Sequence, residues 1–133
     1  MLKDIAIPVV EGIIVAIIKE GTTTEPEYNV YLINTQNIPL KNVLVSSTGY
    51  GVVKEEQVTT STLRFYFEEV ETASFVKIEG LTEELFAIAN EYWVSYYIDG
   101  TIYDKKYIFL PETITENNFT IVPIILKKGV MIK

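Results

Sequence analysis

The sequence predicts an all-β domain, an immunoglobulin-like antiparallel β-sandwich of about seven or eight strands with one short helical turn. Three observations predict it. The apolar residues lie in short runs, these runs are rich in β-branched and aromatic side chains, and turn-forming residues separate them. A chain of 133 residues fits one core, so we expect residues 1–133 to form a single domain.

The first half of the chain contains three predicted strands. Residues 12–19, GIIVAIIK, are typical of a strand covered on both faces, and the Thr-rich residues 22–26 interrupt it. Residues 28–34 and 40–47 predict the next two strands. The two glycines within residues 46–51 predict a turn or bulge with positive φ.

The clearest alternation of apolar and polar residues lies in residues 62–68. Leu63, Phe65 and Phe67 point to one side of a predicted strand, which indicates a strand with one buried face and one solvent-exposed face. Residues 73–78 repeat the alternation more weakly and predict a further strand.

A short helical turn is predicted after these strands. Leu81, Leu85 and Ile88 have helical spacing, and Thr82 precedes two glutamates that suit the N-terminal end of a helix. We therefore expect one or two helical turns with Thr82 as the capping residue.

A β-hairpin is predicted where residues 90–98 lead into Asp99-Gly100, the strongest short hairpin signal in the chain. Counting outward from this turn, the predicted cross-strand pairs are Ile98–Thr101, Tyr97–Ile102, Tyr96–Tyr103, Ser95–Asp104, Val94–Lys105, Trp93–Lys106 and Tyr92–Tyr107. Four tyrosines then share one face of the hairpin, and Trp93 and Tyr97 lie on the other.

The two ends of the chain complete the prediction. Residues 119–126 predict a last strand, in which Pro123 favours an edge position or a bulge. Residues 5–18 are apolar but shorter than the ~20 residues of a membrane-spanning helix, and residues 1–4 do not resemble the start of a signal peptide. We expect no membrane association and a cytoplasmic location.

The composition excludes several classes of function. The chain has no histidine and no cysteine, which removes imidazole bases, thiol nucleophiles and the usual zinc ligands. A formal net charge of −7 disfavours nucleic acid as a partner, because phosphate backbones bind clustered Lys and Arg. The sequence therefore predicts no enzymatic activity, no cofactor and no nucleic-acid partner.

Acidic residues are the only candidates for a metal site. They cluster at residues 55–56, 68–71 and 83–84. Neighbouring residues on a strand point to opposite faces, and no cluster matches a calcium loop, so we interpret them as solvated surface and predict no metal. Phosphate-binding glycine motifs do not occur either.

The aromatic hairpin is the most specific feature of the sequence. Tryptophan and tyrosine present flat, partly polar surfaces that bind partner proteins or sugars, although such residues also pair across strands simply to stabilise a sheet. The candidate interaction surface consists of Tyr92, Trp93, Tyr96, Tyr97, Tyr103 and Tyr107.

Several segments together resemble a known family. KDIAIP, YLINT, VLVSSTGYG, TSTLRF, SFVKIE, NEYWVSYYIDG and IYDKKYIF are similar to segments of small uncharacterised bacterial proteins, some of which are labelled phenylalanyl-tRNA synthetase alpha subunit. The resemblance runs from Lys3 to about Phe109. It implies a cytosolic bacterial protein and carries over no catalytic residue. The label implies ATP-dependent aminoacylation, but Arg64 is the single arginine of an acidic chain far shorter than a synthetase catalytic core.

Three hypotheses about function follow. The leading one is a non-enzymatic interaction or structural module that binds a protein partner or a second copy of itself through an exposed sheet face or edge. The alternative is a small-ligand or carbohydrate-binding module that uses the aromatic face. A synthetase-related protein is a second, disfavoured alternative.

Overall fold

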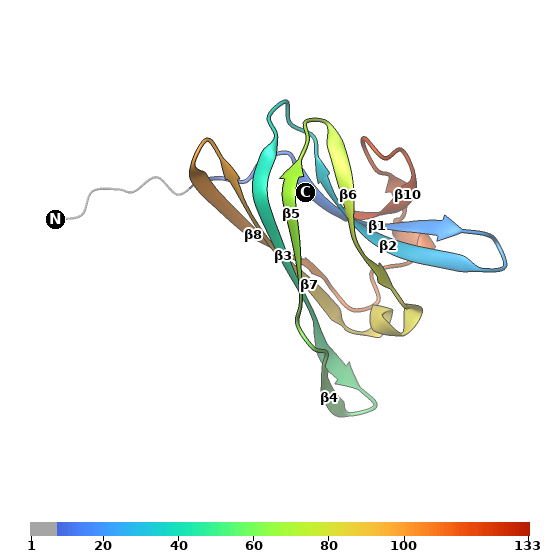
Figure 1. The fold of residues 1–133 in the computed structure, drawn as a ribbon. Helices are drawn as coiled ribbons and strands as arrows, with labels where there is room; N and C mark the ends of the chain where they lie inside the picture. The colour runs from blue at the N-terminus through green and yellow to red at the C-terminus, as the bar shows by residue number, and fades with distance from the viewer. Residues whose placement is uncertain (1–7) are drawn as a thin grey trace.

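Two antiparallel β-sheets pack face to face as a sandwich, which confirms the predicted fold class (Figure 1). The structure, a computed structural model, describes residues 8–133. Within these residues there are ten strands and two short 3₁₀ turns, more strands than predicted. The interpretation of residues 1–4 concerns positions outside the described part of the chain.

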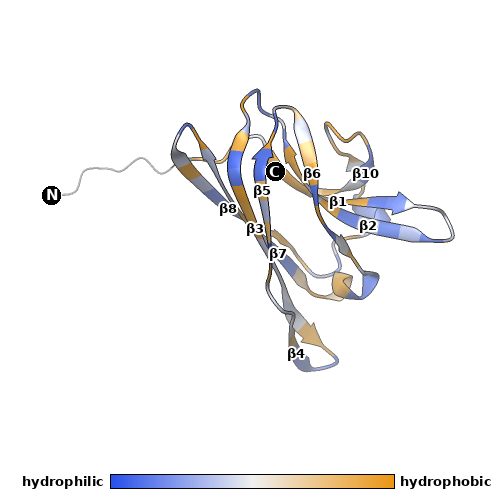
Figure 2. Ribbon diagram, viewed as in Figure 1, coloured by the Kyte–Doolittle hydropathy of each residue, from blue (hydrophilic) through white to orange (hydrophobic). Residues whose placement is uncertain are grey.

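The first sheet has the strand order β6-β2-β1-β10-β9. Its strands are β1 (Ile13–Gly21), β2 (Pro26–Asn34), β6 (Ser74–Leu81), β9 (Thr120–Ile121) and β10 (Lys128–Ile132). The central strand β1 is buried on both faces, as predicted, since its first six residues are all at most 4% exposed. Figure 2 shows this hydrophobic start of β1 in orange and its hydrophilic end in blue.

The segment predicted as the last strand takes another course. Only β9 forms within residues 119–126, and the prediction of a strand there is wrong beyond Ile121. Ile124 and Leu126 have positive φ values of 68° and 57°, so the backbone folds over. Val122 is buried against Ile14, Ala16 and Ile18, and the loop thereby covers the outer side of β1. Residues 122–126 therefore have the composition of a strand but form a loop that covers a second apolar cluster.

The second sheet is organised around one long strand. Its strands are β3 (Leu40–Val53), β4 (Glu56–Thr59), β5 (Leu63–Val70), β7 (Ala89–Ile98) and β8 (Thr101–Phe109). One side of β3 pairs with β7, and its other side pairs first with β5 and then with β4. The far end of β3 and β4 form a hairpin arm that projects beyond the sandwich (Figure 1).

The predicted turn at residues 46–51 is wrong, because β3 continues through both glycines. A Cβ atom on Gly49 would lie 2.9 Å from the Ile88 side chain, and one on Gly51 would lie 3.1 Å from it. These glycines therefore allow close packing of Ile88 against β3 and are not needed for a positive φ.

The alternation in β5 is confirmed only in part. Phe65 and Phe67 are partly buried against the main core, whereas Leu63 remains 50% exposed. The Leu63 side chain lines an open cleft together with Leu81 and Leu85, which leaves it accessible.

The helical prediction corresponds to a single 3₁₀ turn, η1 (Glu83–Ala87); a second, η2 (Glu116–Asn118), precedes β9. Thr82 occupies the N-cap position, but its side chain makes no capping hydrogen bond; instead its carbonyl oxygen accepts from the Leu85 amide at 3.0 Å. None of residues 8–133 belongs to a helix long and apolar enough to span a membrane.

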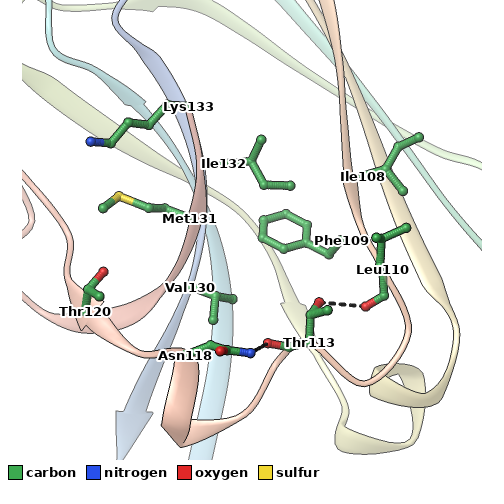
Figure 3. Close-up of a pocket in the computed structure, with 10 residues that line it drawn as sticks. All are labelled: Ile108, Phe109, Leu110, Thr113, Asn118, Thr120, Val130, Met131, Ile132 and Lys133. Atoms are coloured by element: carbon green, nitrogen blue, oxygen red, sulfur yellow. Dashed lines mark hydrogen bonds between the residues drawn. The ribbon is translucent and has the colours of Figure 1, made fainter.

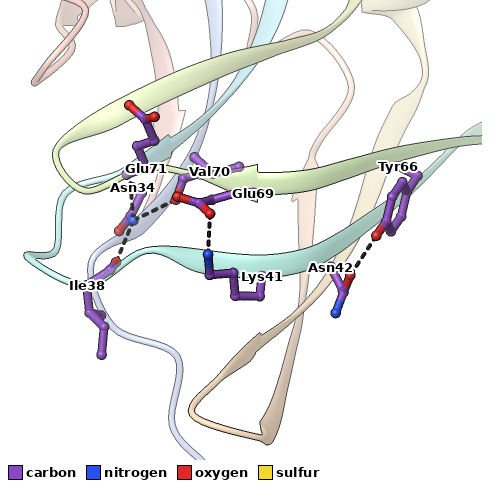
Figure 4. Close-up of polar contacts among 8 residues, drawn as sticks. All are labelled: Asn34, Ile38, Lys41, Asn42, Tyr66, Glu69, Val70 and Glu71. Atoms are coloured by element: carbon purple, nitrogen blue, oxygen red, sulfur yellow. Dashed lines mark hydrogen bonds and ion pairs between the residues drawn. The ribbon is translucent and has the colours of Figure 1, made fainter.

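A buried asparagine joins the two sheets at one end of the sandwich. Asn34, fully buried at the end of β2, donates its side-chain amide to the carbonyl oxygens of Ile38 at 2.8 Å and Glu71 at 3.1 Å (Figure 4). Its Oδ1 atom accepts from the Gln36 amide at 3.0 Å. The β2–β3 turn and the end of β5 are thus attached to the same side chain.

We predict that Gly129→Ala destabilises the fold by about 2–3 kcal/mol or more, because a Cβ at this position would overlap the Ile17 carbonyl oxygen of β1. Urea unfolding measures the change. Gly80→Ala is the matched control, since its Cβ would make only an ordinary contact, 3.5 Å from the Asn29 side chain. Equal effects of the two substitutions would contradict this account.

Candidate functional site

The aromatic hairpin forms with the predicted register. Asp99 and Gly100 both have positive φ, 48° and 77°, as a two-residue hairpin turn requires. All seven predicted cross-strand pairs, from Ile98–Thr101 to Tyr92–Tyr107, are present between β7 and β8. The turn signal and the two-residue period of a strand were sufficient to place each side chain.

The face that carries four tyrosines is the core of the sandwich. Tyr92 and Tyr96 are 1% exposed and Tyr107 is fully buried, so these three cannot belong to the interaction surface. Tyr103 is partly buried and stacks on Tyr96, with ring centroids 5.3 Å apart. The prediction grouped these residues with the exposed ones because both faces of the hairpin are aromatic.

Two of the buried tyrosines make hydrogen bonds across the sandwich. Tyr107 in β8 donates to the Ile13 carbonyl oxygen of β1 at 2.7 Å, and Tyr92 in β7 donates to the Glu79 carboxylate of β6 at 2.8 Å. Burial raises the pKa of both phenols, so both remain protonated donors.

The opposite face of the hairpin is exposed and forms what we call the outer aromatic face. It consists of Leu44, Tyr66, Trp93, Tyr97 and Ile102, which are between 39% and 59% exposed. Strand pairing makes it continuous, because Leu44 pairs with Tyr66, and Tyr97 with Ile102. Leu44, Trp93 and Ile102 also line one shallow depression.

The sequence predicted only two members of this face, Trp93 and Tyr97, as site residues. Leu44, Tyr66 and Ile102 were missed as site residues. The predicted register did place Ile102 opposite Tyr97, whereas Leu44 and Tyr66 come beside the hairpin through the pairing of β3 with β5 and β7. The alternation in residues 62–68 did place Tyr66 on the wet side of its strand. It did not indicate which strand lies next to it.

The charges around the outer aromatic face are mixed in sign. The Lys106 ammonium lies 4.7 Å from the centroid of the Trp93 ring and 4.0 Å from the Glu91 carboxylate. Lys41 and Glu69 form an ion pair, and Tyr66 donates to the Asn42 side chain at 2.6 Å (Figure 4). These contacts hold the rim in a defined conformation without a strong field of one sign.

A groove of about 470 Å³ lies between β8 and β10, where the two sheets part (Figure 3). Phe109, Val130 and Ile132 make it mostly apolar. Two of its polar side chains are engaged, since Thr113 donates to the Leu110 carbonyl oxygen at 2.6 Å and Asn118 donates to the Thr113 carbonyl oxygen at 2.9 Å, whereas the Thr120 and Lys133 side chains also line the groove without such a contact among the described residues. The groove therefore combines its volume with mostly apolar walls and with the polar side chains of Thr120 and Lys133.

Glu20 is the centre of a polar cluster on the first sheet. Its carboxylate accepts hydrogen bonds from Lys127, from the Tyr31 hydroxyl at 2.6 Å and from Asn29 at 2.8 Å. Burial alone would raise the pKa of Glu20, but these three hydrogen bonds outweigh it and lower the pKa to about 2. Since Lys127 belongs to the loop that covers β1, the cluster fastens this loop to the sheet.

The acidic residues of the clusters at residues 55–56, 68–71 and 83–84 all lie at exposed positions. In the described part of the chain, no three acidic side chains approach closely enough to hold a metal ion.

Comparisons with protein-family models, with curated proteins and with solved structures gave no match to this chain.

We expect Tyr107→Phe to lower the free energy of unfolding by about 1–3 kcal/mol, because the buried Ile13 carbonyl oxygen loses its donor. Chemical denaturation monitored by Trp93 fluorescence measures this. Tyr103→Phe is the control and should cost less than ~0.5 kcal/mol, because the Tyr103 ring is only partly buried. A Tyr107→Phe protein as stable as the wild type would show that the cross-sheet hydrogen bond contributes nothing.

The Glu20 cluster predicts a pH-dependent contribution to stability. The pKa of Glu20 in the folded state is about 2, below its ordinary value of 4.5, so the contribution is complete above pH 4.5 and is lost as the pH falls towards 2. Glu20→Gln should cost about 1–3 kcal/mol at pH 7 and progressively less below pH 4.5. Unfolding midpoints between pH 7 and pH 3 provide the measurement, with the exposed Glu25→Gln as control. A difference independent of pH would contradict the role of the Glu20 carboxylate.

Proposed function

We propose that this chain is a non-enzymatic protein-interaction module and that it binds a partner protein through the outer aromatic face. The observation that carries the proposal is the exposure of five large side chains in one continuous surface, among them Trp93 at 46% and Tyr66 at 59%. Contiguous apolar surface of this kind marks interaction sites on soluble proteins more often than scattered single residues do.

The outer aromatic face has the composition of an interface centre. Tryptophan and tyrosine supply most of the binding energy in many protein interfaces, and charged residues usually form the rim. Here the ion pair of Lys41 with Glu69 and the contact of Lys106 with Trp93 lie beside the apolar side chains. Because strands hold these side chains in register, few rotamers have to be ordered on binding.

A protein surface fits this face better than a sugar does. A carbohydrate ring stacks on an aromatic ring whose face is open, whereas the Lys106 ammonium lies over the Trp93 ring. The residues around the face are also balanced in charge, which suits an apolar contact with a neutral surface. The groove between β8 and β10 supports the small-ligand alternative by its volume of about 470 Å³ and its mostly apolar walls, but none of its lining residues belongs to the outer aromatic face.

We also propose that the fold is immunoglobulin-like. Strands β1, β2 and β6 adjoin in one sheet, and β3, β7 and β8 adjoin in the other. The same arrangement of the first, second and fifth strands against the third, sixth and seventh occurs in immunoglobulin-like sandwiches, if β4 and β5 are taken as additions beside β3. Strands β9 and β10 extend the first sheet beyond this pattern.

Position-specific cross-linking tests the interaction. We expect a photoreactive amino acid at position 102 to form a discrete cross-linked product in cells of the source organism, because Ile102 lies at 51% exposure within the outer aromatic face. The same amino acid at position 121, where Ile121 is 56% exposed on the first sheet, serves as control and should give no such product. The substitution Trp93→Ala should reduce the product at position 102 by at least about tenfold.

The outcome of cross-linking distinguishes the occupants of the face. A product of twice the chain mass, together with concentration-dependent sedimentation, identifies a second copy, and any other mass identifies a different protein. Equal products at positions 102 and 121, or a product insensitive to Trp93→Ala in a folded protein, would refute the proposal.

A further inference from the structure

A second concave feature opens on the side of the sandwich between β3 and β6. This cleft has a volume of about 190 Å³, well above the roughly 30 Å³ that one water molecule occupies in the liquid. Polar side chains line it from both sheets, and Leu63, Leu81 and Leu85 form its apolar walls. It lies on the inner side of β7, away from the outer aromatic face, so the two features are independent.

Two buried polar residues face this cleft with unused hydrogen-bonding atoms. Asn90 is 4% exposed and Ser47 is 7% exposed. The Asn90 amide donates to the carbonyl oxygens of Leu85 at 2.8 Å and Ile88 at 3.1 Å, which fixes its orientation and directs Oδ1 towards Gly49 and the cleft. The hydrogen bonds described for residues 8–133 use only the Nδ2 atom of Asn90 and do not involve the Ser47 hydroxyl. Neither Asn90 Oδ1 nor the Ser47 hydroxyl is sealed off from the cleft, since Gln36 Oε1 is the one fully buried polar side-chain atom without a partner in this part of the chain. Both atoms are therefore available to accept a hydrogen bond from a molecule in the cleft.

A carboxylate completes the polar lining. Glu79 accepts the hydroxyl hydrogen of Tyr92 at 2.8 Å through Oε2, which leaves Oε1 free. In the part of the chain that the structure describes, no Lys or Arg side chain forms a salt bridge with Glu79. Because the Tyr92 hydrogen is already donated, its oxygen acts only as a further acceptor.

Acceptors therefore outnumber donors in this cleft, and one of them carries a charge. The complementary group is a cation with several N–H donors on an apolar stem, which describes a primary ammonium on an alkyl chain. We propose that this cleft binds a primary alkylammonium group, with the ammonium between Glu79 and Asn90 and the methylenes against Leu81 and Leu85. The net charge of −7 raises the local concentration of such cations.

Gly49, whose lack of a side chain accommodates Ile88, also borders the cleft. Its backbone does not have positive φ, so the turn chemistry that the sequence suggested does not explain the glycine. A Cβ at this position would lie 3.5 Å from Asn90 Oδ1 and 3.1 Å from the Thr60 methyl group, which would narrow the space in front of the amide oxygen.

Titration with n-butylammonium chloride at constant ionic strength, followed by amide NMR, tests the proposal. We expect saturable shifts of the amides of Gly49, Leu85 and Tyr92 with a Kd of the order of millimolar. Neutral n-butanol and anionic butyrate should bind at least about tenfold more weakly, because neither carries the ammonium charge that Glu79 requires. Absence of saturable shifts, or equal binding of n-butanol, would overturn the proposal.

Variants locate the binding. Glu79→Gln should weaken n-butylammonium binding by about tenfold, since it removes the charge but keeps an acceptor for Tyr92. Glu68→Gln, on the exposed side of β5, is the matched control and should bind as the wild type does. If Glu79→Gln does not fold, Ser47→Ala, which should weaken binding several-fold, takes its place. Unchanged binding in a folded Glu79→Gln protein would also overturn the proposal.

A second ligand distinguishes whether the bound ammonium belongs to a protein lysine or to a free amine. Nα-acetyl-lysine amide reproduces a lysine side chain of a protein, and n-butylammonium reproduces a free amine. Tighter binding of the acetyl-lysine amide assigns the cleft to a protein lysine, and tighter binding of n-butylammonium assigns it to a free amine. Both results support the alkylammonium site, and neither depends on the outer aromatic face.

Discussion

The separation and alignment of the two sheets depend on tyrosines that reach across the core. Sheets in a sandwich lie about 10 Å apart, and a tyrosine spans most of this distance with its hydroxyl at the far side. Tyr107 and Tyr92 end on acceptors of the opposite sheet, the Ile13 carbonyl and the Glu79 carboxylate. An aliphatic core tolerates sliding of one sheet over the other, whereas a directed hydrogen bond at the tip of a rigid ring permits a single alignment.

Because one face of β7 and β8 is buried in the core, the other face is exposed. Side chains alternate along a strand, so burial of Tyr92 and Tyr96 exposes Trp93 and Tyr97. The outer aromatic face is therefore a product of the same hairpin that fixes the core. Glu79 has two roles in this arrangement. It accepts a hydrogen bond from the Tyr92 hydroxyl, and it lines the cleft in which we propose that an alkylammonium group binds.

Local signals predicted local structure well. The Asp99-Gly100 turn fixed the whole hairpin register, and the apolar run in β1 indicated a strand covered on both sides. Features that depend on contacts between residues far apart in the sequence could not be predicted. Alternation alone cannot tell which of two aromatic faces meets the other sheet. Residues 122–126 have the composition of a strand but form a loop, because Val122 packs on the apolar outer side of β1. The glycines at 49 and 51 are explained by the close packing of Ile88, which is distant in the sequence. Ser47 and Asn90 line the same cleft only because β3 pairs with β7.

The hairpin arm formed by the end of β3 and by β4 packs little against the two sheets of the sandwich. Every residue of β4 is exposed, and Val52 at 63% and Val58 at 37% belong to neither of the two hydrophobic clusters. Its backbone hydrogen bonds can therefore open in a local fluctuation that leaves the sandwich intact, and amide exchange there reports on the arm alone. The positive-φ turn at Lys54 and Glu55 is consequently the site where the chain best accepts a proteolytic cut or an inserted sequence without loss of the folded core.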